Sequence, residues 1–375
     1  MHATPKIAIV ANLPVSYVKN SGASPEGYHC VWLTTLSQIL QDTSQFDIHW
    51  VIPSKEIKQY QLIRFQNQSF HLIPKARTLI GLCTAYLYDY LSIRRIIKRI
   101  QPDIVHAWGT ENCHGLVVSR IKTKKILSIQ GVLRACAKRA RIALFERLQG
   151  WLYEAQTLRR FKYITVESLW AREQVIEHAP DSEVRLWEYA IADDFYHTLR
   201  NLSTTPCCVL AGSDTPVKNV ASAIRVFKRP ELSHVTLYLA GVMPGAYTDL
   251  TPNIIPMGFV PHHTIAGLLS QTWALVHPSL ADSCPNIVKE ARVMGVPAVV
   301  TTECGAKQYI IDGESGFIIP PNDDDALANA VLTITKSKQT NLDMGKIDQE
   351  RCRNAISKDT MRAGLLSLYE YVLNH

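Results

Sequence analysis

Two carboxylates stand eight positions apart in the stretch PSLADSCPNIVKEARVMGVP, and their types and spacing could serve chemistry. Asp282 precedes a predicted helix, and Glu290 lies inside it at the border of an apolar stripe. Pro285 is pre-organised for the first helical position, which leaves Ser283 or Cys284 as the cap. A solvated flank position is the ordinary interpretation of such a Glu, so a ligand role needs support from the rest of the chain.

Strands and helices alternate along the chain, which indicates parallel sheets covered by helices on both faces. The polar stretch EYAIADDFYHTLRNLSTTP interrupts this alternation and predicts a linker near residues 191–203. The predicted fold class is therefore α/β, with two tandem Rossmann-like domains, 1–195 and 196–357, whose strand ends face a cleft. The strands are predicted at residues 6–11, 47–52, 103–107, 125–129, 163–166, 207–211, 235–240, 274–277 and 298–301, and one long helix at 138–160.

Composition is that of an ordinary soluble protein. The chain has 375 residues, of which 47% are hydrophobic and 19% charged, and no apolar run is long enough to span a bilayer. Nine cysteines without a Cys-x-x-Cys pair suit reduced thiols in cytoplasm better than a disulfide framework or a zinc site.

The positive charge is concentrated in the first half. Residues 1–195 carry 25 Lys and Arg against 17 Asp and Glu, a net of +8, whereas the remainder has a net of −1. The run 120–162 is the most basic, and it reads either as a solvated face or as a docking surface for an anionic membrane or acceptor. Nucleic acid is disfavoured because no recognition module is visible. An apolar set at helical spacing is expected to pack in the core: Leu144, Leu148, Trp151, Ala155 and Leu158.

The run 273–321, WALVHPSLADSCPNIVKEARVMGVPAVVTTECGAKQYIIDGESGFIIPP, resembles the carboxy-terminal half of the retaining glycosyltransferases of family 4, which have the GT-B architecture. Upstream, VLAGSDTPVKNVASAI and MGFVPHHTIAGLLS support the resemblance, and PDIVHAWGTE and KKILSIQGVL extend it more loosely into the first half. The elements that match in order and spacing are Pro278-Ser279, Asp282, Glu290-Ala291, Gly295 with Pro297, Cys304-Gly305, and Asp312-Gly313 with Gly316.

The resemblance implies a role for each acid. Glu290 would accept hydrogen bonds from the ribose hydroxyls of a nucleotide-sugar, and Asp282 would stabilise positive charge at the anomeric carbon. The diphosphate would lie at the start of the helix, at the free N–H groups of Asn286 and Ile287. The resemblance also implies that the carboxy-terminal helix, 358–375, packs back on the first domain.

Lys218 is the second catalytic candidate, because a cation beside the departing diphosphate lowers the barrier to its release. Gly212 and Ser213 at the preceding strand end, with Ser283 and Cys284 ahead of the helix, complete the predicted donor-binding set. Ser213 stands where the family usually has an Arg, so half of the usual phosphate clamp is missing.

On the acceptor side, the resemblance points to the loop NSGASPEGYH with Gly22 and Gly27, and to Gln130. Gln130, where many members have His, can hydrogen-bond a sugar hydroxyl but cannot transfer a proton. His106 is a further candidate because it ends a predicted strand beside the cleft, although a structural His is the more common interpretation. The acids at 323–325 are interpreted as helix-start residues and not as metal ligands.

The sequence therefore predicts a metal-independent, retaining hexosyltransferase that uses a UDP- or GDP-linked sugar as substrate and needs no cofactor. The acceptor would be a saccharide or lipid-linked saccharide of cell-surface polysaccharide or glycoconjugate synthesis, and the location cytoplasmic or peripheral on the inner face of the membrane. Two alternatives remain: an epimerase or phosphorylase of the same architecture, or an inactive sugar-nucleotide-binding relative.

Overall fold

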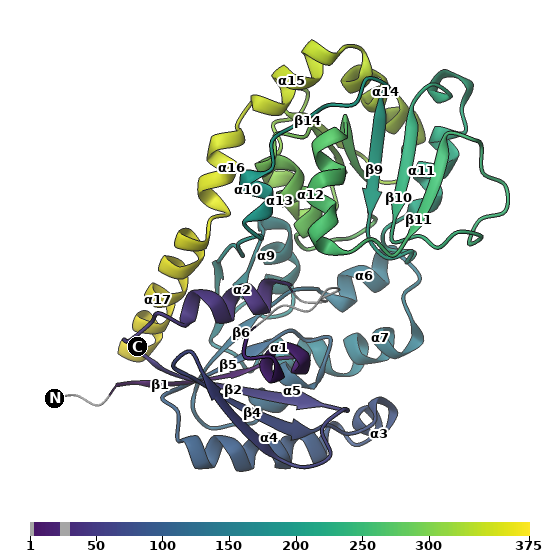
Figure 1. The fold of residues 1–375 in the computed structure, drawn as a ribbon. Helices are drawn as coiled ribbons and strands as arrows, with labels where there is room; N and C mark the ends of the chain where they lie inside the picture. The colour runs from purple at the N-terminus through teal and green to yellow at the C-terminus, as the bar shows by residue number, and fades with distance from the viewer. Residues whose placement is uncertain (1–3, 23–30) are drawn as a thin grey trace. The chain divides into compact units, whose positions relative to one another are not determined.

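The computed structural model describes residues 4–22 and 31–375 and divides the chain into two compact units (Figure 1). Unit 1 comprises Met1–Arg134, Ala143–Ala190 and Lys358–His375, and unit 2 comprises Ala135–Ile142 and Ile191–Ser357. The sequence placed the main border after residue 195, whereas the units part after residue 190.

Unit 1 is built on an eight-stranded sheet with the order β3-β4-β2-β1-β5-β6-β7-β8. Every pairing is parallel except that of β3 with β4. The strand order reverses direction between β1 and β5, so this sheet has a topological switch point there. The strands are β1 (Lys6–Val10), β2 (Asp47–Ser54), β3 (Gln61–Phe65), β4 (Gln68–Pro74), β5 (Ile104–Trp108), β6 (Lys124–Ser128), β7 (Tyr163–Val166) and β8 (Glu183–Leu186).

The antiparallel hairpin β3–β4 was not predicted. Its turn residues, Gln66 and Asn67, both have positive φ angles, of 50° and 56°. A turn of this kind is normally signalled by Asn-Gly or Asp-Gly, whereas the residues at this turn are Gln66 and Asn67. The sheet of unit 1 is therefore parallel, as predicted, except for this hairpin at its edge.

Helices of unit 1 include the carboxy-terminal one, α17, whose Met361, Leu365, Tyr369 and Val372 are buried in one hydrophobic core with β1 and α2. This packing explains why the last residues of the chain belong to unit 1. The helices are α1 (Val15–Lys19), α2 (Val31–Leu40), α3 (Thr78–Cys83), α4 (Leu87–Ile100), α5 (Cys113–Ser119), α7 (Leu144–Gln149), the π-helical turn η1 (Gly150–Glu154), α8 (Ala155–Leu158), α9 (Leu169–Ile176) and α17 (Lys358–Asn374).

The single helix predicted at 138–160 is wrong. Helix α6 (Leu133–Arg139) ends before α7 begins at Leu144, because residues 135–142 cluster with unit 2 while the following residues cluster with unit 1. The expected burial of its apolar face is also wrong in part. Leu158 is buried, but the side chains of Leu144 and Trp151 are 62% and 69% exposed.

Unit 2 has a six-stranded, fully parallel sheet in the order β11-β10-β9-β12-β13-β14, the doubly wound arrangement with its switch point between β9 and β12. The strands are β9 (Cys207–Ala211), β10 (Thr236–Ala240), β11 (Ile254–Gly258), β12 (Ala274–His277), β13 (Ala298–Thr301) and β14 (Gly316–Ile319). The helices are α10 (Asp194–His197), α11 (Val220–Phe227), η2 (Pro230–Leu232), α12 (His262–Gln271), α13 (Asn286–Val293), η3 (Gly305–Tyr309), α14 (Asp324–Thr335), α15 (Lys338–Lys346) and α16 (Gln349–Ala355).

Two strands of unit 2, β11 and β14, were missed by the sequence analysis. Strand β11 lies at an edge and contains Pro256, and a Pro lowers the expectation of a strand. Strand β14 is only four residues long. In the described parts of the chain, no helix combines the length and the apolar character needed to cross a bilayer.

Candidate donor site at the switch point of unit 2

The two strands at the switch point of unit 2 are each followed by a loop that carries a predicted site residue. Strand β9 leads through Gly212 and Ser213 to Lys218, and β12 leads to Asp282. Ligands of open α/β sheets bind outside the carboxyl ends of the strands at such a point. The topology of unit 2 therefore places both predicted catalytic residues where a ligand is expected.

Asp282 forms the centre of a charged cluster. Its Oδ2 accepts a hydrogen bond from the ammonium of Lys218 and lies 2.9 Å from Nε2 of His277, the last residue of β12. Because an ionised carboxylate can only accept, Nε2 of His277 carries the proton. The side chains of Lys218 and Asp282 are 25% and 15% exposed, so the pair is largely enclosed yet reachable.

Hydrogen bonds to backbone carbonyls hold the two loops together. The N–H of Leu280 donates to the carbonyl of Val217 at 2.8 Å, and the side-chain amide of Asn219 donates to the carbonyl of Pro278 at 3.2 Å. Asp282 is fixed from the other side as well, because the N–H of Gly305 donates to its carbonyl at 2.7 Å. The cluster is thus positioned by several segments and not by one flexible loop.

The electrostatics of the cluster favour an ionised Asp282. Burial alone would raise its pKa, but the Lys218 ammonium and the hydrogen bond from His277 lower the pKa of Asp282 well below its ordinary range. Burial lowers the pKa of Lys218, and the nearby Asp282 carboxylate raises it to a net value above the ordinary one. The pKa of His277 is lowered, chiefly by burial. At neutral pH the cluster therefore contains one anion, one cation and a neutral imidazole.

Glu290 lies on α13 and is almost fully buried, with 4% of its surface exposed. Its Oε1 is 2.9 Å from Nε2 of His262, the first residue of α12. Burial lowers the pKa of His262, but the hydrogen bond and charge of Glu290 raise it to a net value above the ordinary one. Glu290 is therefore a buried, oriented carboxylate and not a solvated flank residue.

Helix α13 begins one residue later than predicted. Pro285 is its N-cap and makes no side-chain capping bond, and the first helical residue is Asn286, followed by Ile287. The predicted cap residues, Ser283 and Cys284, are buried ahead of the helix. The prediction that one of them caps the helix is wrong, because the cap is Pro285 itself, whose ψ of 125° lies outside the helical range.

At the end of β9, the backbone passes unusually close to a neighbouring loop. A Cβ on Gly241 would lie 2.3 Å from the carbonyl oxygen of Gly212, so a larger residue at 241 is excluded. Gly212 itself has a φ of +145°, and a Cβ on it would lie 3.8 Å from Cε of Lys218. Ser213 is exposed beside this position.

Unit 1 places the predicted acceptor-side residues less favourably. His106 is fully buried; its Nδ1 is 2.9 Å from the hydroxyl of Tyr369, and its Nε2 is 2.7 Å from the hydroxyl of Ser128. With burial lowering its pKa to about 3, His106 is a neutral core residue. A ligand cannot reach it in this structure, which favours the structural interpretation.

The other acceptor-side predictions have different outcomes. Gly22, with a φ of +88°, donates its N–H to the carbonyl of Tyr17 and so ends α1. Gly27 lies outside the described residues. Gln130 is half-buried and follows the end of β6, where it precedes Gly131.

Glu111 is a carboxylate that the sequence analysis did not select. It follows β5, one of the two switch-point strands of unit 1, and lies between two glycines: a Cβ on Gly109 would be 2.3 Å from Oε2, and one on Gly131 would be 2.6 Å from Oε1. Burial raises the pKa of Glu111 to about 7, and the nearby Glu154 carboxylate adds to the effect. A carboxyl that titrates near neutrality at a strand end is typical of functional positions.

Three functional candidates were therefore missed: His262, His277 and Glu111. His277 had a usable signal, because it ends a predicted strand five residues before Asp282. Glu111 had a weaker one, because it ends the segment PDIVHAWGTE and follows a predicted strand. His262 had none, since its pairing with Glu290 depends on segments far apart in the chain.

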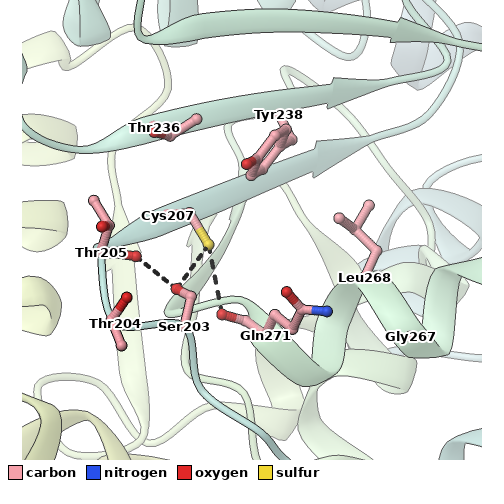
Figure 2. A pocket seen from close by; sticks show the side chains of 9 residues that line it. All are labelled: Ser203, Thr204, Thr205, Cys207, Thr236, Tyr238, Gly267, Leu268 and Gln271. Atoms are coloured by element: carbon pink, nitrogen blue, oxygen red, sulfur yellow. Dashed lines mark hydrogen bonds between the residues drawn. The ribbon is translucent and has the colours of Figure 1, made fainter.

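A separate hollow of about 260 Å³ lies in unit 2 at the amino-terminal ends of β9 and β10, the opposite strand ends from those at the switch-point site (Figure 2). Its polar groups are satisfied locally: the Ser203 hydroxyl donates to the carbonyl of Thr205, and the Cys207 thiol donates to the carbonyl of Gln271. It contains no charged side chain. This hollow therefore offers little to an anionic ligand, unlike the switch point.

Within residues 4–22 and 31–375, no cluster of three or more His, Cys, Asp or Glu side chains could hold a metal ion. Of the acids at 323–325, Asp323 caps α14 by accepting from the N–H of Ala326, and Asp324 pairs with Arg225. These residues are helix-start acids, as predicted.

The two doubly wound units define the GT-B fold, and solved structures agree. The chain is similar to sucrose-phosphate synthase from Thermosynechococcus elongatus, with a TM-score of 0.76, 14% identity and 99% of each chain covered. It is also similar to HepE from Anabaena in complex with UDP and glucose, with a TM-score of 0.69, 13% identity and coverage of 98% of this chain and 100% of that one.

Part of the chain also matches glycosyltransferases in sequence. The family model described as "Glycosyl transferases group 1" matches residues 205–337, which include both switch-point loops and α13. A UDP-Gal:alpha-D-GlcNAc-diphosphoundecaprenol alpha-1,3-galactosyltransferase of Escherichia coli is 32% identical over 108 residues, 29% of this chain and 26% of that protein. The capsular polysaccharide glycosyltransferase CapM of Staphylococcus aureus is 26% identical over 98 residues, 26% of each chain. These matches span about a quarter of the relatives' length.

Proposed function

We propose that the protein is a retaining glycosyltransferase that binds a nucleotide-sugar on unit 2 and transfers the sugar to a saccharide or lipid-linked acceptor held by unit 1. The observation that carries this proposal is the convergence of Lys218, Asp282 and α13 at the switch point of a sheet that matches a glycosyltransferase family. The two glycosyltransferases named above, CapM and the galactosyltransferase of Escherichia coli, support a role in polysaccharide or glycoconjugate synthesis.

In the proposed donor complex, the diphosphate lies at the start of α13, where the N–H groups of Asn286 and Ile287 and the positive end of the helix favour an anion. Glu290 accepts hydrogen bonds from the ribose hydroxyls in place of its bond from His262. Lys218 has three N–H donors, of which one is engaged by Asp282, so the others can contact the leaving phosphate.

The reaction then needs few protein groups. The bond from the anomeric carbon to the diphosphate oxygen breaks, and the acceptor oxygen bonds to that carbon on the same face. The acceptor proton passes to the departing phosphate oxygen, so no protein base is required. Oδ1 of Asp282 faces the developing positive charge, and Lys218 stabilises the growing negative charge on the diphosphate. The proposal includes no metal ion and no cofactor, and the donor is UDP- or GDP-linked.

In unit 1, we propose that Glu111 and Gln130 bind hydroxyl groups of the acceptor. Glu111 follows β5 at the switch point and Gln130 follows the neighbouring β6, and the carboxyl group of Glu111 lies against Gly131, the residue after Gln130. A cytoplasmic site of action beside the membrane accords with the basic charge of this half of the chain.

The test is titration of the full chain with a panel of UDP- and GDP-sugars, scored by thermal stabilisation and by nucleotide release. Glu290→Gln is expected to weaken donor affinity roughly ten- to hundredfold, because hydrogen bonds to a charged group are lost. Asp343→Asn, an exposed carboxylate on α15, is the matched control and should bind the donor normally. Binding without transfer would favour an inactive relative, an epimerised donor would favour an epimerase, and no response to any sugar would refute the donor site.

A further inference from the structure

Unit 1 exposes an unusual group of large apolar side chains on neighbouring helices. Leu79 of α3 and Trp151 of η1 are 70% and 69% exposed, and large apolar surface of this kind is uncommon outside interaction sites. We define the apolar patch by these residues and their exposed neighbours: Leu79, Ile80, Leu87, Tyr88, Leu91, Leu144, Trp151 and Leu152.

Hydrogen bonds join the segments that carry the apolar patch. The hydroxyl of Tyr153, in η1, donates to the carbonyl of Leu82, in α3, at 2.6 Å. The hydroxyl of Tyr86, which precedes α4, donates to the side chain of Gln149, in α7, at 3.1 Å. The patch therefore belongs to one packed group of helices and is not a scatter of isolated side chains.

Charge on the same helices is strongly one-sided. Along α4, the exposed positions that follow Leu91 on the same helical face are Arg94, Arg95 and Lys98. Among the exposed charged residues of α3, α4, α7 and η1, all of which the structure describes, Glu146 is the one acid. Apolar side chains thus sit at one end of α4 and cations at the other.

We propose that this surface docks unit 1 on a bilayer that contains anionic lipid. Aliphatic and aromatic side chains next to cations match the boundary between acyl chains and anionic headgroups, where Trp and Tyr also reside. A nucleic acid would leave the aliphatic side chains without a partner. The inference deepens the proposed function, since it supplies the membrane surface on which a lipid-linked acceptor would be presented.

The surface overlaps only in part with the basic run 120–162 of the sequence, because α7 and η1 lie within that run whereas α3 and α4 lie outside it. Arg139, within that run, belongs to unit 2 and forms an ion pair with Glu303, with Nε and Oε2 2.5 Å apart. The cations of the proposed docking surface are those of α4 and α7. Its apolar side chains are those that the core of unit 1 leaves exposed.

The test uses vesicles of phosphatidylcholine with or without phosphatidylglycerol, and the full chain without any nucleotide-sugar. Wild-type protein is expected to bind the anionic vesicles in a salt-sensitive way and to ignore the neutral ones. Arg94→Gln with Arg95→Gln should weaken binding roughly thirtyfold, since each cation near such a surface contributes substantially. The matched control removes two exposed cations of unit 2, Lys336→Gln with Lys338→Gln, and should retain binding.

The apolar contribution is tested by Leu79→Ser with Ile80→Ser, with Leu199→Ser as control, because Leu199 is 86% exposed but lies in unit 2. Quenching of Trp151 by brominated lipid, absent in Trp151→Phe, would place the patch in the bilayer. Equal loss in the unit 2 controls, or no attachment of wild-type protein at low salt, would overturn the inference. Patch-dependent self-association without vesicle binding would also overturn it, in favour of a second copy. Donor binding is measured separately, so a failed donor site would not be mistaken for a failed docking surface.

Discussion

Replacing Lys218 by Met should expose how far the cluster at the switch point of unit 2 depends on its ion pair. The variant keeps the length of the side chain but removes the charge, which leaves the Asp282 carboxylate enclosed with His277 as its neighbour. Breaking a fully buried pair costs about 3–5 kcal/mol, and an exposed pair contributes about 0–1 kcal/mol. With side chains 25% and 15% exposed, the expected loss of unfolding free energy at pH 7 is about 1–3 kcal/mol.

The loss should depend on pH in a defined direction. In the wild type, the pKa of Asp282 is lowered, so its stabilising effect is present above the unfolded pKa of about 3.9 and fades as pH falls through the folded value. Without Lys218, burial dominates and the pKa of Asp282 rises. The variant then regains stability as its carboxyl is protonated, so the gap between the two proteins should narrow from pH 7 toward pH 4.

Urea unfolding at a series of pH values measures this gap, and hydrogen exchange in β12 and the following loop locates it. Lys228→Met is the matched control, because Lys228 pairs with Asp249, whose side chain is 97% exposed. Asp282→Asn and the double variant complete a cycle that isolates the coupling between the two residues. A coupling below about 0.5 kcal/mol, or a gap that does not change with pH, would refute the reasoning.

Other variants test the remaining parts of the site. Lys218→Ala should lower kcat for sugar transfer more than it weakens donor binding, because the negative charge on the leaving diphosphate is largest in the transition state. Equal losses in kcat and in donor affinity would make Lys218 a binding residue. Since Glu290 raises the pKa of His262, the pair stabilises the fold below about pH 6.5 and less as pH rises through the folded pKa, so the cost of His262→Asn should shrink at alkaline pH in thermal unfolding. Glu111 has a folded pKa of about 7 against about 4.3 in the unfolded chain, so the unfolding free energy of the wild type should fall as pH rises from about 4.3 to about 7. Glu111→Gln should flatten that fall, and a pH profile unchanged by the substitution would contradict the burial argument.

Local patterns account for much of what the sequence predicted correctly. Strand β9 (Cys207–Ala211), strand β12 (Ala274–His277) and strand β13 (Ala298–Thr301) are continuous apolar runs bounded by turn residues, so their limits were predicted exactly. The alternation of strands and helices gave the α/β class, and the motif around Asp282 and Glu290 gave the resemblance. These features depend on neighbouring residues, which is why they can be read along the chain.

Where the sequence failed, distant segments decided the outcome. The helix predicted at 138–160 is interrupted because residues 135–142 pack with a different unit from those that follow. The apolar positions Leu144 and Trp151 have the spacing of core residues, yet they are exposed because none of the described elements of unit 1 covers them. Periodicity shows which side chains share a face, but it does not show whether anything packs against that face.

The sequence by itself determined which residue types stand at the strand ends of unit 2 and how far apart the two acids lie. Only the tertiary structure decided their partners: Lys218 meets Asp282 across 64 positions, and His262 meets Glu290 across 28. It also decided the protonation of Glu111, because a carboxyl is shifted toward pH 7 by the water it loses on burial and not by its neighbours in the chain. Charge pairing and desolvation act through space, and the parallel sheet that brings strand ends to one edge is what makes these groups neighbours.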